Sequence, residues 1–480
     1  MTNIESTSRS SQAFRTPKAS TALALAGLVA LLLQCPAASA NPRVFPTGTT
    51  IYDPQKAYNS FIVFGAPDGK THLIDMDGHE VHRWDKWGFP SEILDPAITG
   101  GKKGELLVQL TNAGAASGAA PAPFGGIFTN RTIGELDWNG NIVWEWGERA
   151  PGGAARQNHD WARLPNGNTI IVATVDRVIP SLSKQPVGDQ ALYEITPKGD
   201  IVWTWLVADH VAEFGLSAEG LKQLRASLKD GDKSHGFLTI NDMQPIGPNK
   251  WFDGGDKRFD PDNIVVDSRQ ASFIAIIDKK SGKIVWRLGP DHATDHTPVL
   301  RPVLKFDVPR PFDQTSGQHD AHIIEKGLPG AGDLLVFDNE GASGFPPTRL
   351  GTVWGSRVLE INPVTQQIVW QYSGVDSDRA LWSFGSSFIS SARRLPNGNT
   401  LIDEGMNGRL FQVTPKGEIV WEYINPYFAD SFLGEGRSAH TNWVYRAQPV
   451  AYDWIPEGTP HSEKAVIELD PAQFHVPTSQ

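Results

Sequence analysis

The chain has 480 residues and a formal net charge of −11, with 54 acidic against 43 basic side chains. An acidic protein repels a phosphate backbone, which argues against nucleic acid as a partner. The chain also contains 47 glycines, 35 prolines and 16 tryptophans. This composition is typical of many short strands joined by tight turns, so we expect an all-β protein.

Residues 1–40 have the pattern of a secretory signal peptide. Three basic residues precede the apolar run TALALAGLVALLL, and the small residues ASA end at Ala40. The run is too short for a comfortable membrane span, and no later segment approaches twenty consecutive apolar residues. We expect cleavage near Ala40 and a periplasmic or secreted product without a membrane span. Cys35, the only cysteine, would leave with the leader, and a lipid anchor at Cys35 is the alternative.

Six internal repeats follow, each a strand, a tight turn and a second strand with an aromatic residue. The repeats carry the tryptophans Trp84, Trp144, Trp203, Trp286, Trp370 and Trp421. Another hairpin precedes several of them, as in ARLPNGNTIIVA and RRLPNGNTLIDE, so each unit supplies about four antiparallel strands. The repetition predicts a six-bladed β-propeller over residues 41–460, followed by a C-terminal tail at 461–480.

The inner strands of a propeller begin at one mouth of its central channel. Aligning the repeats on the LPNGN turn places His159, Thr239, His319 and Ser390 at one equivalent position, and His440 begins the expected last inner strand. Polar side chains that converge at the mouth of a channel are the usual place for a site. We therefore expect these residues to meet although they are far apart in the sequence.

The segment GQHDAH, residues 317–322, places two histidines and an aspartate just ahead of the run DLLVFDNE. Side chains alternate across a strand, so His319 and His322 are expected on opposite faces, where they could not share a metal ion. A metal site would need an irregular turn, and no HExxH or cysteine ligand set supports it. His319 then either has a chemical role or is tied to backbone at a strand end, and His322 is expected inside a blade.

Arg269 stands within the apolar strand sequence NIVVDSRQASFIAIID. An arginine in this position must be paired, exposed at a strand end, or available to an anion. Pairing with Asp256 or Asp267 is the structural alternative to anion binding. The turn FDNE at 337–340 could bind calcium through oxygen atoms, but it lacks an EF-hand pattern and is better interpreted as a turn.

Four segments together resemble the bacterial arylsulfate sulfotransferases, which are exported six-bladed propellers that need no nucleotide sulfate donor. The segments are HDWARLPNGNT, GQHDAHII with LLVFDN, GDKRFDPDNIVVDSRQASFIAIID, and LPNGNTLIDEGMNGRLFQVTPKGEIVWEYINPY. The resemblance implies transfer of a sulfuryl group from an aryl sulfate donor to a phenolic acceptor by a ping-pong mechanism. It implies no cofactor and no metal.

The resemblance also assigns catalytic residues. His319, in the QH motif ahead of FDN, is expected to be the nucleophile that becomes transiently sulfated. Arg269, in the SR motif, is expected to stabilise the charge on the sulfuryl oxygens. His159, in the HD motif before LPNG, is expected to act as a further donor or as an acid or base. His440 matches no family motif, and we expect the same role for it from its predicted place at the start of the last inner strand.

The substrate-binding residues expected beside them are Asn241, Thr239, Gln318 and Asn339. Asn241 is expected to share the sulfuryl oxygens with Arg269. Thr239 stands where the family often has a histidine. This difference keeps a non-catalytic, ligand-binding propeller open as an alternative. A metal- or cofactor-dependent propeller enzyme, such as a lyase or an oxidoreductase, is the other alternative.

Overall fold

The computed structural model describes residues 46–112, 128–230, 236–290, 308–341, 343–344, 347–348, 355–434 and 437–468. The chain divides into two units, residues 1–44 and Phe45–Gln480, and every described residue belongs to the second. The predicted signal peptide therefore lies outside the described residues. In the part of the chain that the structure describes, no helix is both long and apolar enough to cross a membrane.

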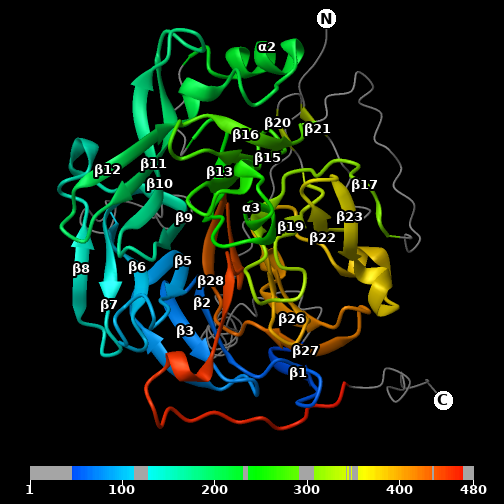
Figure 1. The fold of residues 1–480 in the computed structure, drawn as a ribbon. Helices are drawn as coiled ribbons and strands as arrows, with labels where there is room; N and C mark the ends of the chain where they lie inside the picture. The colour runs from blue at the N-terminus through cyan, green and yellow to red at the C-terminus, as the bar shows by residue number, and fades with distance from the viewer. Residues whose placement is uncertain are drawn as a thin grey trace, which may run out of the picture. The chain divides into compact units, whose positions relative to one another are not determined.

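Six antiparallel sheets form the blades of a β-propeller, and Figure 1 shows them around a common centre. From the inner to the outer strand, the first blade contains β30 (Ala447–Val450), β2 (Phe61–Ala66), β3 (Lys70–Ile74) and β4 (Glu80–Trp84). The second contains β5 (Trp87–Ile93), β6 (Leu106–Asn112), β7 (Asn130–Leu136) and β8 (Ile142–Trp146). The third contains β9 (Gln157–Arg163), β10 (Thr169–Val178), β11 (Pro186–Ile195) and β12 (Ile201–Leu206).

The other three blades follow in chain order. The fourth contains β13 (Ile240–Pro245), β14 (Ile264–Ser268), β15 (Phe273–Ile277) and β16 (Ile284–Leu288). The fifth contains β18 (His319–Ile323), β19 (Leu334–Asp338), β22 (Arg357–Asn362), β23 (Gln367–Tyr372) and β17 (Arg310–Pro311). The sixth contains β24 (Ser391–Arg394), β25 (Thr400–Glu404), β26 (Arg409–Val413), β27 (Ile419–Ile424) and β1 (Gly48–Tyr52). The predicted six-bladed propeller is confirmed.

The remaining described elements are short. Two small hairpins pair β20 (Ser343–Gly344) with β21 (Pro347–Thr348), and β28 (Ala429–Gly434) with β29 (Arg437–Thr441). The α-helices are α2 (Ala218–Ser227) and α3 (Lys250–Asp253). The 3-10 turns are η2 (Pro151–Gly153), η3 (Val207–His210), η4 (Lys257–Phe259), η6 (Gly374–Ser377), η7 (Leu381–Ser383), η8 (Gly405–Asn407) and η9 (Tyr452–Trp454).

Both ends of the chain close the ring of blades. β30, near the C-terminus, pairs with β2 to complete the first blade, while β1 pairs with β27 on the outside of the sixth. His440 lies on β29, so the prediction that it begins the last inner strand is wrong, because β30 fills that place. The predicted tail also contributes, since the backbone of Val466 exchanges hydrogen bonds of 2.8 and 2.9 Å with Tyr52 on β1.

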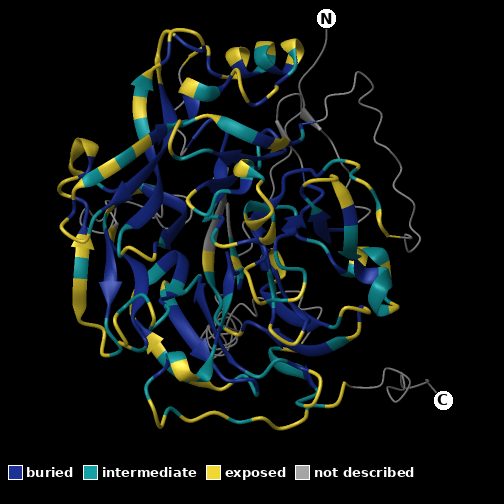
Figure 2. Ribbon diagram, viewed as in Figure 1, coloured by how far each residue is buried: buried dark blue, intermediate teal, exposed yellow. Residues whose placement is uncertain are grey.

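Burial falls from the centre of the blades to the rim, as Figure 2 shows. The strands β2 (FIVFGA) and β15 (FIAII) are buried at every position, because neighbouring blades cover both of their faces. The outer strand β8 (IVWEW) is instead mostly exposed. The apolar core therefore lies between the blades.

The six repeat tryptophans link neighbouring blades. Each indole N–H donates a hydrogen bond to a backbone carbonyl in the outer hairpin turn of the next blade. The bonds are 2.8–3.2 Å long and join Trp84 to Asp137, Trp144 to Pro197, Trp203 to Lys279, Trp286 to Pro363, Trp370 to Pro415, and Trp421 to Met76. The last bond joins the sixth blade to the first, so the set forms a closed ring.

Replacing Trp421 with Phe should lower the free energy of unfolding by about 1–3 kcal/mol, because the ring-closing bond is buried and the Met76 carbonyl would keep only the longer hydrogen bond of 3.3 Å from the Thr49 hydroxyl. Trp370→Phe is the matched control, since Trp370 makes the same bond at an exposed position, and it should cost less than about 1 kcal/mol. Urea denaturation followed by fluorescence measures both. Equal losses would show that burial of the bond does not matter.

A layer of ion pairs fills the centre of the channel. Arg446 donates hydrogen bonds to Asp160 and Asp242, both at 2.8 Å, and its Nε lies 3.2 Å from Asp320. The three aspartates lie on β9, β13 and β18 and are fully buried. Buried carboxylates are tolerated when a cation and hydrogen bonds compensate them. We call Arg446 and these three aspartates the arginine layer; it separates the two ends of the channel.

Candidate active site

A cavity of about 270 Å³ lies where the inner strands begin. Four of its polar lining residues were predicted from the sequence, namely His159, Thr239, Arg269 and His319. The fifth polar residue, Gln270, was not predicted. Its remaining walls are Phe89, Phe128, Phe388, Ile389, Trp443 and Tyr445. No aspartate or glutamate is among the described residues that line it, so the lining suits an anion with an aromatic group.

Irregular backbone aims the polar side chains into the cavity. His159 and Thr239 have φ values of 60° and 45°, and Asp320, directly after His319, has a φ of 60°. The pairing of β18 with β19 shifts register between His319 and His322. A bulge of this kind re-aims side chains. For this reason the simple alternation expected for GQHDAH fails: His319 faces this cavity and Asp320 belongs to the arginine layer.

The His319 ring has a defined tautomer. Its Nδ1 lies 2.7 Å from the Asn339 Oδ1 and 3.1 Å from the Gly317 carbonyl oxygen. Both partners are acceptors, because the Asn339 amide nitrogen already donates to the Ser386 and Ile389 carbonyls at 2.7 and 2.8 Å. Nδ1 therefore carries the proton, and the lone pair is on Nε2.

The surroundings of His319 also keep its ring neutral. The residue is 3% exposed. Burial, followed by the positive charge of Arg269, lowers the pKa of His319 to about 3. At neutral pH the Nε2 lone pair is thus available for chemistry. The Ile389 backbone N–H donates to this nitrogen at 3.0 Å, so an attack by Nε2 requires this hydrogen bond to be released.

Arg269 is a half-buried cation that has no counter-ion among the described residues. Its guanidinium has no hydrogen bond or ion pair with any residue that the structure describes, and its Nε is fully buried. The structural alternative is excluded, since Asp256 pairs with Arg258 at 2.6 Å and Asp267 accepts from the Ala321 N–H. Burial lowers the pKa of Arg269, yet a guanidinium stays protonated. An unpaired guanidinium that lines a cavity, with its Nε buried, suits an anionic ligand.

Asn241 positions Arg269 and does not face the cavity. Its Oδ1 accepts from the Arg269 backbone N–H at 2.8 Å, and its Nδ2 donates to the Gln318 carbonyl at 2.9 Å. Asn241 is not among the residues that line the cavity, and its expected contact with sulfuryl oxygens stays a prediction. The Gln318 amide donates to the carbonyls of Ser268 and Phe273. Both residues hold β13, β14 and β18 together behind the site.

Thr239 and Asn339 differ in their access to the cavity. Thr239 lines it, and its hydroxyl donates to the Gly236 carbonyl at 3.0 Å. The hydroxyl oxygen can still accept a hydrogen bond from a ligand. Asn339 stands behind His319, where it orients the ring without lining the cavity.

His159 lies across the cavity among aromatic rings. Its Nδ1 is 2.8 Å from the Asn158 Oδ1, which also accepts from Gln190 at 2.9 Å. The Asn158 oxygen is an acceptor, so Nδ1 of His159 carries the proton. The ring lies edge-on to Phe89, with centroids 5.5 Å apart. The structure thus brings His159, Thr239, Arg269 and His319 to one cavity.

Two other predicted features lie elsewhere. His440 does not line the cavity; its side chain is 44% exposed, and its Nδ1 is 3.1 Å from Asp430. In the FDNE turn, Arg357 neutralises Asp338 at 2.8 Å and Glu340 at 3.3 Å, which leaves no reason for a calcium ion. Among the described residues, no group of three or more His, Cys, Asp or Glu side chains could hold a metal ion.

The aromatic wall was not identified residue by residue from the sequence. Phe89 on β5 stacks on Tyr445 with centroids 3.7 Å apart, and the Tyr445 hydroxyl donates to the Asn241 carbonyl at 2.8 Å. Burial raises the pKa of Tyr445 well above its usual range, so this hydroxyl is a structural donor. Flat rings around a cavity of this size accept another aromatic ring. The repeat alignment could have indicated Phe89, which lies near the start of the inner strand β5.

Together, the fold and this cavity define a six-bladed propeller with an anion site built around an unprotonated histidine. The family model for arylsulfotransferases matches residues 98–446, and the chain belongs to this family. The match includes every residue described at the cavity except Phe89. A search of curated proteins gives no significant match.

Several solved structures show a distant likeness. A protein of unknown function from Bacteroides caccae is 12% identical, with 82% of this chain and 99% of that chain covered and a TM-score of 0.41. A streptogramin B lyase is 12% identical over 62% of this chain and 64% of that one, with a TM-score of 0.31. The Dos1 propeller is 8% identical over 83% and 80%, with a TM-score of 0.34.

Sulfate should stabilise the protein through Arg269. At a sulfate concentration about five times Kd, binding should add about 1 kcal/mol of stability, seen as a rise in Tm by scanning fluorimetry. Arg269→Met should abolish this rise. Without sulfate, the variant should be as stable as the wild type or more so, because an unpaired, half-buried charge is removed.

Arg149→Met is the matched control, because Arg149 forms an exposed ion pair with Asp200 and should keep the full response to sulfate. An unchanged sulfate response in Arg269→Met would contradict the assignment of the anion site. A large loss of stability in that variant without sulfate would show instead that Arg269 has a structural partner.

Proposed function

We propose that the protein transfers a sulfuryl group from an aryl sulfate to a phenol through a sulfated His319. One observation carries the proposal: the unpaired Arg269 guanidinium and the neutral His319 line the same acid-free, aromatic cavity. A sulfate ester has charged oxygens that can bind the Arg269 guanidinium and an electrophilic sulfur that His319 can attack. Membership of the arylsulfotransferase family supports the same chemistry.

In the first half-reaction, the Nε2 lone pair of His319 attacks sulfur and forms the N–S bond. The bond between sulfur and the aryl oxygen breaks, and its electron pair goes to that oxygen. His159, when protonated on Nε2, can donate this proton so that a phenol leaves. Arg269 stabilises the charge that is spread over the three sulfuryl oxygens.

The second half-reaction reverses these roles. A phenolic acceptor enters the vacated aromatic cavity, and the now neutral His159 takes its hydroxyl proton. The phenol oxygen attacks sulfur, and the electron pair of the N–S bond returns to Nε2 of His319. Atoms and charges balance, since the donor and acceptor exchange a sulfuryl group for a proton, and no cofactor is consumed. Thr239 can accept a hydrogen bond from the incoming hydroxyl.

The proposed location agrees with this chemistry. The leader predicted at residues 1–40 would export the protein, and outside the cytoplasm no nucleotide sulfate is supplied. An enzyme that takes its sulfuryl group from an aryl sulfate needs none. We therefore propose a periplasmic or secreted enzyme whose partners are an aryl sulfate donor and a phenolic acceptor.

The covalent intermediate is directly measurable. Incubation with 4-nitrophenyl sulfate and no acceptor should add about 80 Da to the protein, the mass of a sulfuryl group, on the peptide containing residues 317–322. Added phenol should remove the adduct and make nitrophenolate release continuous. His319→Ala should abolish adduct and turnover, while Arg269→Met should slow adduct formation on the order of 100-fold.

His440→Ala is the control, since His440 lies apart from the cavity, and it should keep adduct formation. An adduct on His159 would preserve the reaction but change the nucleophile. Turnover of donor by folded His319→Ala would reject the covalent mechanism, and release with water alone would identify a sulfatase.

The low pKa of His319 predicts an unusual pH profile. Protonation would block Nε2 only near pH 3, where the pKa lies. 4-Nitrophenolate is a good leaving group that needs little acid catalysis. The rate constant for its release in a single turnover should therefore stay the same from pH 8 to about pH 5. Stopped-flow absorbance, with fluorescence to check the fold, measures it. A decline with an apparent pKa near 6.5 would show that His319 titrates normally.

A further inference from the structure

The channel has a second cavity at its other end, beyond the arginine layer. This cavity measures about 290 Å³ and shares no lining residue with the active-site cavity. Its lining comes from the late positions of five inner strands, including Glu92, Gln244, His322 and Arg393. Arg446 of the arginine layer lines this cavity, whereas the preceding residue, Tyr445, lines the active-site cavity, so the second cavity has no part in the proposed transfer.

Glu92 contributes an unsatisfied carboxyl group. It lies on the inner strand β5, and no described residue donates a hydrogen bond to it or forms an ion pair with it. Glu92 is half-buried and lines the cavity. Its carboxyl oxygens are therefore available to a ligand that donates a hydrogen bond or carries a positive charge.

Arg393 contributes the opposite charge. One of its nitrogens, Nη2, donates to Asp320 at 2.6 Å. The other two guanidinium nitrogens have no hydrogen-bond partner among the described residues, and Arg393 does not pair with Glu92. The cavity thus holds an open guanidinium edge and an open carboxyl group that do not neutralise each other.

His322, on the inner strand β18, adds a hydrogen-bond acceptor to the cavity. Its Nδ1 donates to the Asp320 carbonyl at 2.9 Å, so Nε2 carries a lone pair, and no described residue donates to it. Burial, followed by the charge of Arg393, lowers the pKa of His322 well below its usual range and keeps the ring neutral. The expectation that His322 lies inside a blade is therefore wrong: it lines this cavity.

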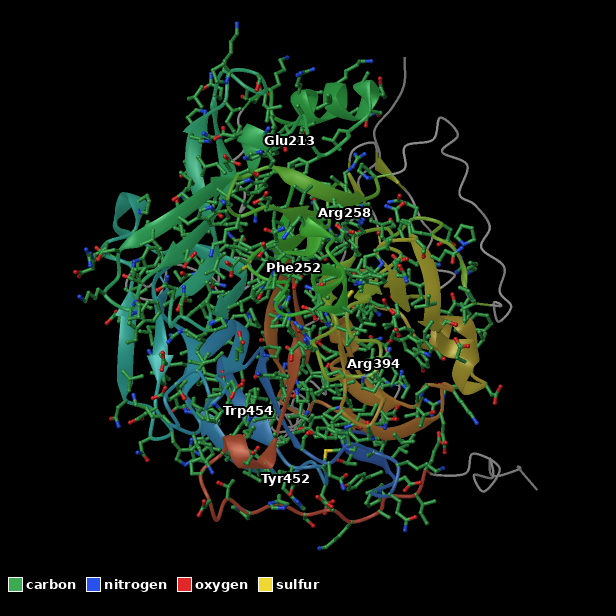
Figure 3. The ribbon with its side chains drawn as sticks, viewed as in Figure 1. Glu213, Phe252, Arg258, Arg394, Tyr452 and Trp454 are labelled. Carbon is green, nitrogen blue, oxygen red and sulfur yellow. The ribbon has the colours of Figure 1, made fainter. Side chains whose placement is uncertain are left out.

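The remaining wall is largely apolar. Leu328, Leu395 and Pro396 line one part of it, and Trp454, on η9, lines another. Figure 3 labels Trp454 together with Arg394, a further lining residue whose Nη2 is paired with Glu360 at 2.6 Å. The cavity therefore offers an apolar surface next to the Glu92 carboxyl group and the Arg393 guanidinium. A matching ligand is a small apolar molecule that carries one positive and one negative group.

We propose that this second cavity binds a free α-amino acid with an apolar side chain. The carboxylate of the ligand would accept from the open edge of Arg393, and its ammonium group would donate to Glu92 and to Nε2 of His322. Its side chain would lie against the leucines, proline and tryptophan. Neither a simple carboxylate nor a simple amine satisfies both open groups.

Binding should depend on pH in a defined direction. Burial, followed by the nearby Asp160, raises the pKa of Glu92 to about 7. The ammonium group prefers the ionised carboxylate, so affinity should rise about tenfold from pH 6 to pH 8 as Glu92 loses its proton. The charged or titratable groups near Glu92 are Asp160, Arg163, Arg393, Arg446, His322 and Glu325.

The test is isothermal titration of the full chain with L-leucine at pH 8. Two analogues remove one charge each: 4-methylpentanoate lacks the ammonium group, and 3-methylbutylamine lacks the carboxylate. Each should bind at least about tenfold more weakly than L-leucine, since a charge-assisted hydrogen bond is lost. Equal binding of all three, or no binding of L-leucine, would overturn the proposal.

Variants locate the site. Glu92→Gln keeps the side-chain shape and breaks no hydrogen bond, so it should fold; it should weaken L-leucine binding about tenfold or more at pH 8 and remove the pH dependence. Glu145→Gln, a matched change on the exposed outer strand β8, should leave binding unchanged. Unchanged binding in Glu92→Gln would overturn the proposal.

Two active-site variants separate this proposal from the proposed transfer reaction. Arg269→Met and His319→Ala should bind L-leucine as the wild type does, because both residues lie beyond the arginine layer. Loss of binding in either would place the ligand in the active-site cavity and overturn the proposal. Glu92→Gln should in turn keep sulfate-ester turnover, so each proposal can fail without the other.

Discussion

The structure depends on closing six blades into a ring, and the repeat tryptophans show how the sequence does it. Each blade alone is a small sheet with two apolar faces, and only neighbours on both sides can cover them. The six indole hydrogen bonds connect every blade to the next, including the sixth to the first. Because the ring is closed, the inner strands have fixed positions around one channel, and residues from distant parts of the chain can form one site.

Closure also gathers charge at the centre, and the arginine layer balances it. Three buried aspartates from three blades share Arg446. A buried ion pair of this type adds little net stability, but removing one partner would leave uncompensated charges. Its structural effect is to divide the channel. One end contains an anion site beside a neutral histidine, and the other contains two open groups of opposite charge.

The active-site cavity departs from the rules that stabilise the rest of the molecule. Elsewhere buried arginines are paired, as Arg409 is with Glu404 at 2.9 Å. Arg269 has no such partner among the described residues, and His159 and Thr239, which line the same cavity, have positive φ. Features of this kind cost stability and persist where an anionic ligand or transition state uses them. In the second cavity, the half-buried Glu92 has no partner among the described residues, and the ligand proposed there would supply one.

The sequence by itself determined the six blades, because hairpin turns and aromatic residues recur with local spacing. It also determined that His159, Thr239 and His319 meet, since equivalent repeat positions converge in a closed ring. Only the tertiary structure decided which face each side chain takes, because bulges at the starts of the inner strands break the alternation that a sequence pattern assumes. It alone placed His440 on a separate hairpin and His322 at the second cavity. It also left Arg269 unpaired and Asn241 bonded to backbone, because hydrogen-bond partners come from other blades and no local pattern specifies them.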